Sequence, residues 1–176
     1  MPVILPGQTD IYALTDARLS CGRTLETVVS ALLGAGVKII QYREKHMKSG
    51  EMLEECRLMR RLTREAGACF IVDDHVDLAI LAEADGVHIG QEDFPLPAVR
   101  QLVGPKMCTH SPEQARAAVA VGADYIGVGP VFATRTKEDV VAPVGFEYLD
   151  WVAAHISIPF VAIGGIKEHN IADVAR

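Results

Sequence analysis

Short apolar runs alternate along the chain with longer segments in which apolar residues recur every three or four positions. The apolar runs predict strands at Ile11–Leu14, Val37–Tyr42, Cys69–Asp73, Gly86–Ile89, Asp124–Gly129 and Ile158–Gly164, and only a weak one at Lys106–Cys108. The amphipathic segments predict helices over Thr24–Gly34, Ser49–Glu65, Val76–Ala82, Leu96–Leu102, Ser111–Val121 and Phe146–Ala154, with a last one near Glu168. Ser49 is the expected N-cap of the longest helix.

The predicted strands are apolar on both faces, which is typical of parallel strands covered by helices. Strictly alternating strands and helices indicate an α/β fold, either a TIM (β/α)8 barrel or a doubly wound sheet. The first strand–helix turn has no GxGxxG motif, so nothing favours the doubly wound dinucleotide-binding type. In both folds ligands bind at the carboxyl ends of the strands.

Composition narrows the class of protein. The chain has 176 residues, is 49% hydrophobic and 23% charged, and carries a net charge of −6. This length suits a single domain spanning 1–176, and the negative charge argues against general nucleic-acid binding. No apolar run approaches the roughly 18 residues of a membrane span. The N-terminus does not resemble a signal peptide, and the four cysteines have no CxxC spacing, so we expect a cytoplasmic protein with reduced thiols.

Polar residues gather just after the predicted strands. They are Thr15 and Asp16, then Gln41, Arg43 and Lys45, then Asp73 and Asp74, then Gln91 and Asp93, then Thr109 to Ser111, then Thr134 to Lys137, and finally Gly164 and Gly165. Gln41, Arg43 and Lys45 share one side of their strand by its period of two. Basic side chains bind phosphate oxygens, paired carboxylates hold Mg²⁺, and glycines allow backbone N–H groups to approach a phosphate. Together these residues indicate a Mg²⁺–diphosphate site with a second phosphate site nearby.

Each of these residues also has a structural interpretation. Asp73 and Asp93 could cap the helices that follow them, and Arg43 and Lys45 could be solvated surface charges. The glycine pair at 164–165 could simply end a strand. His88 lies between apolar neighbours in a strand and is expected to be an interior histidine.

Seven segments carry a resemblance to a known family. They are YALTD at 12–16, QYREK at 41–45, VDDHVDLA at 72–79, ADGVHIGQED at 84–93, THSPEQ at 109–114, GADYIGVGPVFATRTK at 122–137 and IPFVAIGGI at 158–166. In this order and combination the chain resembles thiamine phosphate synthase. That family has a TIM-barrel fold and joins hydroxymethylpyrimidine diphosphate to thiazole phosphate, giving thiamine phosphate and diphosphate with Mg²⁺.

The resemblance implies roles for particular residues. Asp74 and Asp93 would bind Mg²⁺, and Arg43, Lys45 and Lys137 would stabilise the departing diphosphate in a dissociative reaction. The pyrimidine diphosphate would be held by Gln41, Tyr42, Arg43, Glu44, Lys45, Asp73 and Lys137, and the thiazole phosphate by Thr134, Arg135, Thr136 and Gly165. Cys108 falls where the family has a substrate-binding serine, and Asp73 where it usually has asparagine. Small molecules are the implied partners, and a homo-oligomer is left open.

The resemblance also predicts gaps. The fifth strand looks defective, about four residues short, and an eighth strand is absent, so we expect the sequence to be C-terminally incomplete and to omit residues of the encoded protein.

Two other functions remain open. One is a thiazole tautomerase of the same fold with His110 as proton shuttle, and the other is a non-catalytic phosphate-ligand-binding barrel. Ala133–Val141 is the expected mobile lid.

Overall fold

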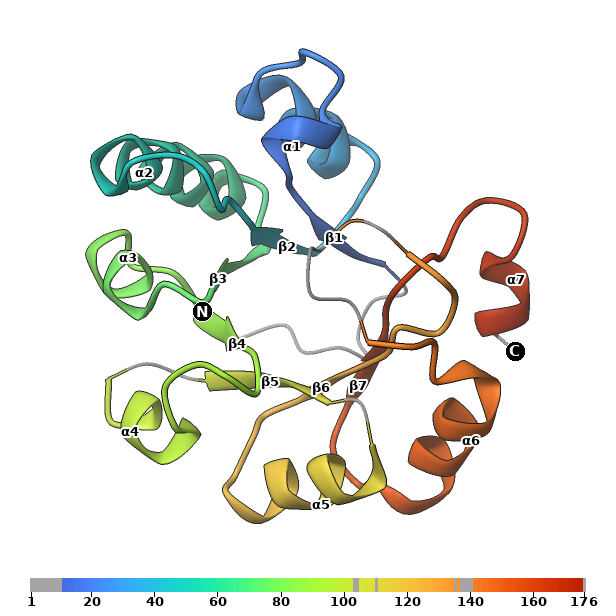
Figure 1. Ribbon diagram of the computed structural model, residues 1–176. Helices are drawn as coiled ribbons and strands as arrows, with labels where there is room; N and C mark the ends of the chain where they lie inside the picture. Colours follow the sequence, from blue (N-terminus) through green and yellow to red (C-terminus); the bar gives the residue numbers. More distant parts are fainter. Residues whose placement is uncertain (1–10, 103–104, 110, 135, 137–140, 176) are drawn as a thin grey trace. The chain divides into compact units, whose positions relative to one another are not determined.

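The computed structural model describes residues 11–102, 105–109, 111–134, 136 and 141–175, with the backbone alone for 105–109 (Figure 1). Two compact units make up the chain. The first unit is Met1–Ile89 with Asp93–Lys106, and the second is Gly90–Glu92 with Met107–Arg176.

The first unit alternates strands and helices. Its elements are β1 (Tyr12–Leu14), the 3₁₀ turn η1 (Ala17–Leu19), α1 (Leu25–Gly34), β2 (Ile39–Tyr42), α2 (Ser49–Glu65), β3 (Cys69–Asp73), α3 (Val76–Leu81), β4 (Gly86–Ile89) and α4 (Leu96–Arg100). The strands pair in parallel in the order β1-β2-β3-β4, so Ile39 lies opposite both Tyr12 and Cys69. In Figure 1 the helices of this unit lie outside its strands.

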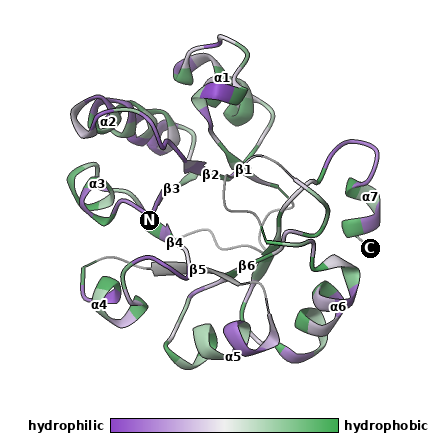
Figure 2. Ribbon diagram, in the orientation of Figure 1, coloured by the Kyte–Doolittle hydropathy of each residue, from purple (hydrophilic) through white to green (hydrophobic). Residues whose placement is uncertain are grey.

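The core of the first unit lies between its central strands and its helices. Every residue of β2, β3 and β4 is buried, which explains why these strands carry apolar residues on both faces. Helix α2 contacts β3, and its buried residues Met52, Cys56, Met59 and Thr63 have a spacing that places them on one helical face. The hydropathy colouring shows apolar and polar residues mixed along this helix (Figure 2). Burial raises the pKa of the Cys56 thiol to about 12, so it remains a neutral core residue.

The start of α2 corrects one prediction. Ser49 is the first helical residue and Lys48 is the N-cap, so Ser49 does not cap the helix. The backbone N–H of Lys48 donates to Oε2 of Glu51 over 3.3 Å, which satisfies the entry of the chain into the helix. In α1 the predicted start holds, because the Thr24 hydroxyl accepts from the backbone N–H of Thr27.

The second unit continues the same alternation with β5 (Pro105–Thr109), α5 (Pro112–Ala120), β6 (Ile126–Val128), α6 (Gly145–His155), β7 (Phe160–Ala162) and α7 (Ile171–Val174). Its strands are parallel in the order β5-β6-β7. Met107–Thr109 pairs with three consecutive residues of β6, so a fifth strand forms where the sequence indicated only a weak one, and the expected shortening of this strand stays a prediction. The short apolar run gave only a weak signal for this strand, because backbone pairing with β6 does not require apolar side chains.

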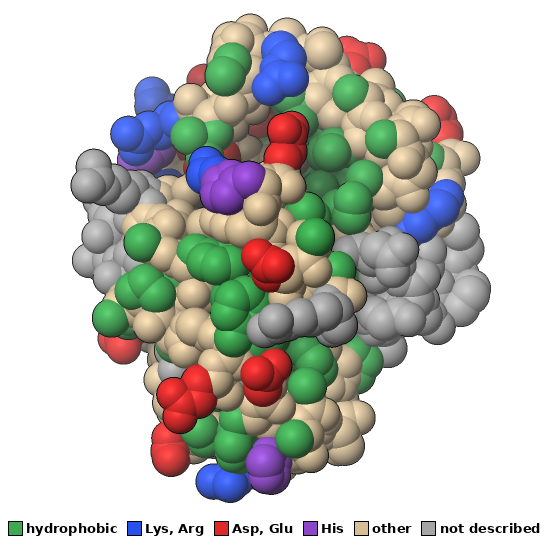
Figure 3. All heavy atoms as spheres, turned by 90° about the vertical axis from the view of Figure 1, so that its right-hand side faces the viewer, with side chains coloured by type: hydrophobic (Ala, Val, Ile, Leu, Met, Phe, Trp, Pro, Cys, Tyr) green, Lys and Arg blue, Asp and Glu red, His purple; other side chains and the backbone are tan. Residues whose placement is uncertain are grey.

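The predicted α/β class with parallel strands is confirmed in both units. The closed barrel, the single domain and the absent eighth strand stay predictions. Among the described helices none has the length and hydropathy needed to cross a bilayer. In the space-filling view, acidic and basic side chains are scattered between apolar and backbone surface (Figure 3).

Candidate functional site

At the carboxyl end of β2, successive side chains point to opposite sides of the strand. Gln41 donates from Nε2 to the hydroxyl of Tyr12 in β1 at 2.9 Å. Tyr42 faces the other way and donates its hydroxyl to Oε2 of Glu55 in α2 at 2.7 Å. Arg43 and Lys45 reach the same aspartate, so the predicted shared side of these alternate residues is confirmed for the two cations.

Arg43 is held between two carboxylates. Its NH1 donates to Oδ2 of Asp16 at 2.5 Å, and its Nε lies 3.8 Å from Oδ2 of Asp73. Its backbone N–H donates to Oγ1 of Thr15 at 3.2 Å, which fixes the strand end against β1. The Arg43 side chain is 10% exposed, so the structure excludes the interpretation of Arg43 as a solvated surface charge.

Lys45 joins the same cluster from further along the chain. Its Nζ lies 3.2 Å from Oδ2 of Asp73 and pairs with Oδ2 of Asp74. Asp16, Arg43, Lys45, Asp73 and Asp74 therefore form one group, which we call the ion-pair cluster. It sets two cations against three carboxylates at the carboxyl ends of β1, β2 and β3.

The two neighbouring aspartates differ in conformation. Asp73 ends β3 and is 4% exposed, whereas the Asp74 side chain is 26% exposed. Asp74 has a φ of 59°, in the left-handed region that aspartate tolerates better than most residues, and its N–H donates to the carbonyl of His88. This turn carries the Asp74 carboxylate beyond the strand end, next to Lys45. The N-cap of α3 is His75 without a side-chain cap, so Asp73 does not cap that helix.

Two of the predicted substrate-binding residues lie apart from the ion-pair cluster. The Tyr42 hydroxyl faces α2, and burial together with the Glu55 carboxylate raises the pKa of Tyr42 far above its usual value. Oε1 of Glu44 accepts from the backbone N–H groups of Lys45 and His46, so it stabilises the loop. Period two explains both, because residues 42 and 44 alternate with the cations at 43 and 45.

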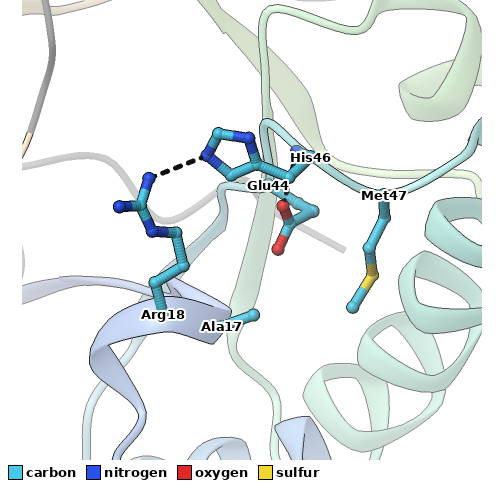
Figure 4. A pocket seen from close by; sticks show the side chains of 5 residues that line it. All are labelled: Ala17, Arg18, Glu44, His46 and Met47. Carbon is cyan, nitrogen blue, oxygen red and sulfur yellow. Dashed lines mark hydrogen bonds between the residues drawn. The ribbon is translucent and has the colours of Figure 1, made fainter.

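A hollow of about 290 Å³ opens beside this loop (Figure 4). Ala17, Arg18, Glu44, His46 and Met47 line it. The NH1 group of Arg18 lies 3.1 Å from Nε2 of His46, within hydrogen-bond distance. His46 is exposed, and this contact joins two residues that are far apart along the chain.

The predicted metal ligands are placed differently from each other. Asp74 belongs to the ion-pair cluster, while Asp93 lies in the exposed turn between β4 and α4. Within the described ranges no three His, Cys, Asp or Glu side chains gather as a ready-made metal centre. One or two carboxylates suffice for Mg²⁺ when waters and substrate phosphates complete its shell. Asp74 keeps a partly exposed carboxylate, so the donor chemistry fits this ion.

The second unit has a site built mainly from backbone. Phe132 N–H donates to the carbonyl of Gly164, and Val131 N–H donates to that of Ile163, which joins the segment after β6 to the end of β7. A Cβ on Gly165 would lie 2.6 Å from the carbonyl oxygen of Ala133, and its φ is +66°, so only glycine fits there. The pair at 164–165 therefore does more than end a strand.

Two of the predicted thiazole-phosphate ligands, Thr134 and Thr136, also lie in this second unit. Thr136 N–H and the Thr136 hydroxyl both contact the Thr134 hydroxyl, at 3.3 and 3.1 Å. Thr134 is partly buried and Thr136 exposed, which leaves hydroxyl groups available to a ligand. Arg135, Lys137, His110, the Cys108 side chain and most of the expected lid lie outside the described residues.

Sequence reasoning missed two supporting residues of the first unit. Asp16 was placed at a strand end without a role, but it accepts from the N–H groups of Arg18 and Leu19 and also pairs with Arg43. Tyr12 was only part of an apolar strand, yet it orients Gln41. The signal for both was their position on β1, which pairs in parallel with β2.

Parallel β–α units with a cluster of cations and carboxylates at their strand ends define an α/β protein with a charged site at the carboxyl edge of its strands. A family model described as thiamine monophosphate synthase matches residues 11–176. Thiamine-phosphate synthase from Lawsonia intracellularis is 56% identical over 100% of this chain and 84% of its own length. The Pelotomaculum thermopropionicum enzyme of the same name is 59% identical over 96% of this chain and 79% of its own length. The chain belongs to the thiamine monophosphate synthase family.

Solved structures agree with this assignment. Thiamine phosphate pyrophosphorylase from Pyrococcus furiosus superposes with a TM-score of 0.81 at 37% identity, covering 93% of this chain and 80% of that one. A 2-keto-3-deoxy-6-phosphogluconate aldolase from Zymomonas mobilis reaches a TM-score of 0.64 at 15% identity, covering 93% and 75%, and shares the fold alone.

Proposed function

We propose that this protein is a transferase that makes thiamine phosphate from hydroxymethylpyrimidine diphosphate and thiazole phosphate. Family membership supports the reaction, and relatives named thiamine-phosphate synthase match nearly the whole chain. The observation that carries the proposal is the convergence of Arg43 and Lys45 on one aspartate at the end of β3. A buried guanidinium and a more exposed ammonium group at one point suit a diphosphate group.

The proposed site uses the ion-pair cluster for the diphosphate. Arg43 offers a planar guanidinium whose orientation Asp16 fixes, and Lys45 offers a mobile ammonium group. Both would stabilise negative charge as the carbon–oxygen bond to the diphosphate breaks. Lys137 is proposed as a third cation for the diphosphate.

Mg²⁺ is proposed as the cofactor, held by Asp74 and Asp93. When bound it would neutralise charge on the leaving diphosphate and orient it. For Asp74 to contribute, its carboxylate has to exchange the contact with Lys45 for one with the ion, and its partial exposure permits that movement. Lys45 is then free to turn to the diphosphate.

The remaining residues would position the two rings. Gln41, fixed by Tyr12, presents its amide on the same side as Arg43. Thr134, Thr136 and the backbone at Gly165 are proposed to hold the thiazole phosphate, since hydroxyl and N–H groups there can donate to phosphate oxygens. The proposed chemistry needs no covalent nucleophile, because the thiazole nitrogen attacks the pyrimidine methyl cation directly and the protein supplies orientation and charge stabilisation.

We also propose that the strands belong to a TIM (β/α)8 barrel and that the protein works in the cytoplasm. The regular order of parallel strands within each unit and the match to the Pyrococcus furiosus structure support the barrel. A homo-oligomer stays open.

The deciding experiment incubates the purified protein with both substrates and Mg²⁺ and follows thiamine phosphate by chromatography. Formation of thiamine phosphate and diphosphate in equal amounts is the expected result. Conversion of a thiazole isomer without any coupling would favour the tautomerase. Binding of both substrates without turnover would favour a phosphate-ligand-binding barrel.

A further inference from the structure

The Asp73 carboxylate stands out within the ion-pair cluster. The residue is 4% exposed, and among the described residues no group donates a well-formed hydrogen bond to its buried Oδ2 atom. Lys45 Nζ at 3.2 Å and Arg43 Nε at 3.8 Å are its nearest cations, and Arg43 Nε likewise has no hydrogen-bond partner there. A buried charge held mainly by long ion pairs is costly, so this contact is open to exchange.

The same two cations are those proposed to bind diphosphate. An incoming diphosphate would therefore be repelled by the Asp73 carboxylate, which lies next to the two cations that attract it. Asp73 cannot turn away to solvent, since it is the last residue of a fully buried strand. Asp74, by contrast, is partly exposed and can leave Lys45.

We propose that Asp73 makes diphosphate binding conditional on a divalent cation, so that the diphosphate enters with its metal and not alone. This inference rests on the proposed function. The three carboxylates of the ion-pair cluster already outnumber its two cations, and the metal would supply the positive charge that the free site lacks. A neutral side chain at position 73 would remove the one carboxylate that pairs with both cations, so diphosphate would bind more strongly without metal.

The size of the effect follows from the short distances. A full charge within roughly 5–6 Å of a phosphate in a half-buried site changes affinity by about ten- to a hundredfold. Asp73→Asn keeps the shape and removes the charge. Asp77→Asn is the matched control, because Asp77 lies exposed in the first turn of α3 and pairs with neither cation in the described contacts.

The test is calorimetric titration of the protein with inorganic diphosphate, once with saturating Mg²⁺ and once with EDTA. The quantity compared is the ratio of the two dissociation constants in each protein. We expect this ratio to be at least tenfold smaller in Asp73→Asn than in the wild type, chiefly because metal-free binding improves. Asp77→Asn should keep the wild-type ratio. Formation of the Mg²⁺–diphosphate complex in solution affects all proteins equally and cancels.

The outcomes separate this inference from the proposed function. Wild-type protein that fails to bind diphosphate even with Mg²⁺ removes the diphosphate site and the inference with it. Binding with Mg²⁺, but equal ratios in wild type and Asp73→Asn, overturns the inference and leaves the site intact. If circular dichroism shows that Asp73→Asn does not fold, Asp73→Ser replaces it. Metal-free binding by the wild type within threefold of its Mg²⁺-loaded affinity overturns the inference without any variant.

Discussion

Arg43→Lys tests whether the guanidinium geometry, and not charge alone, serves the proposed site. The Arg43 guanidinium donates to Asp16 at 2.5 Å while its Nε faces Asp73 at 3.8 Å, so one planar group meets two carboxylates. A lysine has a single nitrogen and cannot hold Asp16 and a phosphate oxygen in the same orientation. Losing one charge-assisted hydrogen bond costs about 1.5–3 kcal/mol. We therefore expect kcat/KM for the pyrimidine diphosphate to fall by about 10- to 150-fold.

The assay is steady-state formation of thiamine phosphate at saturating thiazole phosphate and Mg²⁺. Arg57→Lys serves as the control, because Arg57 is exposed in α2 and pairs only with Glu54 among the described salt bridges. Thermal unfolding measured in parallel separates a loss of structure from a loss of binding. A kcat/KM for Arg43→Lys within threefold of the wild type, with normal stability, would refute the role given to the guanidinium.

Three further predictions address the metal, the second unit and the helix-facing tyrosine. Asp93→Ala should abolish the Mg²⁺ dependence and most of the activity without lowering the melting temperature, and unchanged kinetics would contradict its role as a ligand. Gly165→Ala should lower the free energy of unfolding by about 1–3 kcal/mol, because a Cβ would meet a carbonyl oxygen at 2.6 Å at a φ of +66°, and raise KM for thiazole phosphate. Gly34→Ala, where a Cβ meets nothing within 4 Å, is its neutral control in calorimetry. Tyr42→Phe should lower the free energy of unfolding, measured by urea titration, by about 1–2 kcal/mol through the lost hydrogen bond to Glu55, and should leave kcat unchanged. A large fall in kcat would show that Tyr42 acts in the proposed site.

The ion-pair cluster shows which contacts can be predicted from sequence patterns and which cannot. Period two along β2 correctly placed Arg43 and Lys45 on one side, because side chains of a strand alternate strictly. The same rule places Tyr42 and Glu44 on the other side of the strand. The prediction assigned all five residues of the QYREK motif to the substrate and so did not make this distinction. The pairing of Asp16 with Arg43 was not predicted, since it depends on the register between β1 and β2.

Strand β5 in the second unit shows a limit of predicting strands from hydrophobic patterns. Hydrophobic periodicity detects strands by what they bury, and Lys106–Cys108 offered too few apolar residues. Its pairing with β6 is formed by backbone groups that every residue carries, so it leaves little trace in composition. The predicted N-cap of α2 was also wrong. Lys48, and not Ser49, precedes the helix, and its backbone N–H donates to the side chain of Glu51.

The sequence by itself determined the order of strands and helices, the parallel α/β class and the collection of polar residues at strand ends. Apolar periodicity and the alternation of strand side chains are local properties, so they can be followed residue by residue. Only the tertiary structure decided which of those polar groups meet. It buried Asp73 behind both cations, turned Asp74 outward at a φ of 59° and packed Gly165 against Ala133. These contacts join residues from separate strands, and their distances depend on register and loop conformation, which no local pattern specifies.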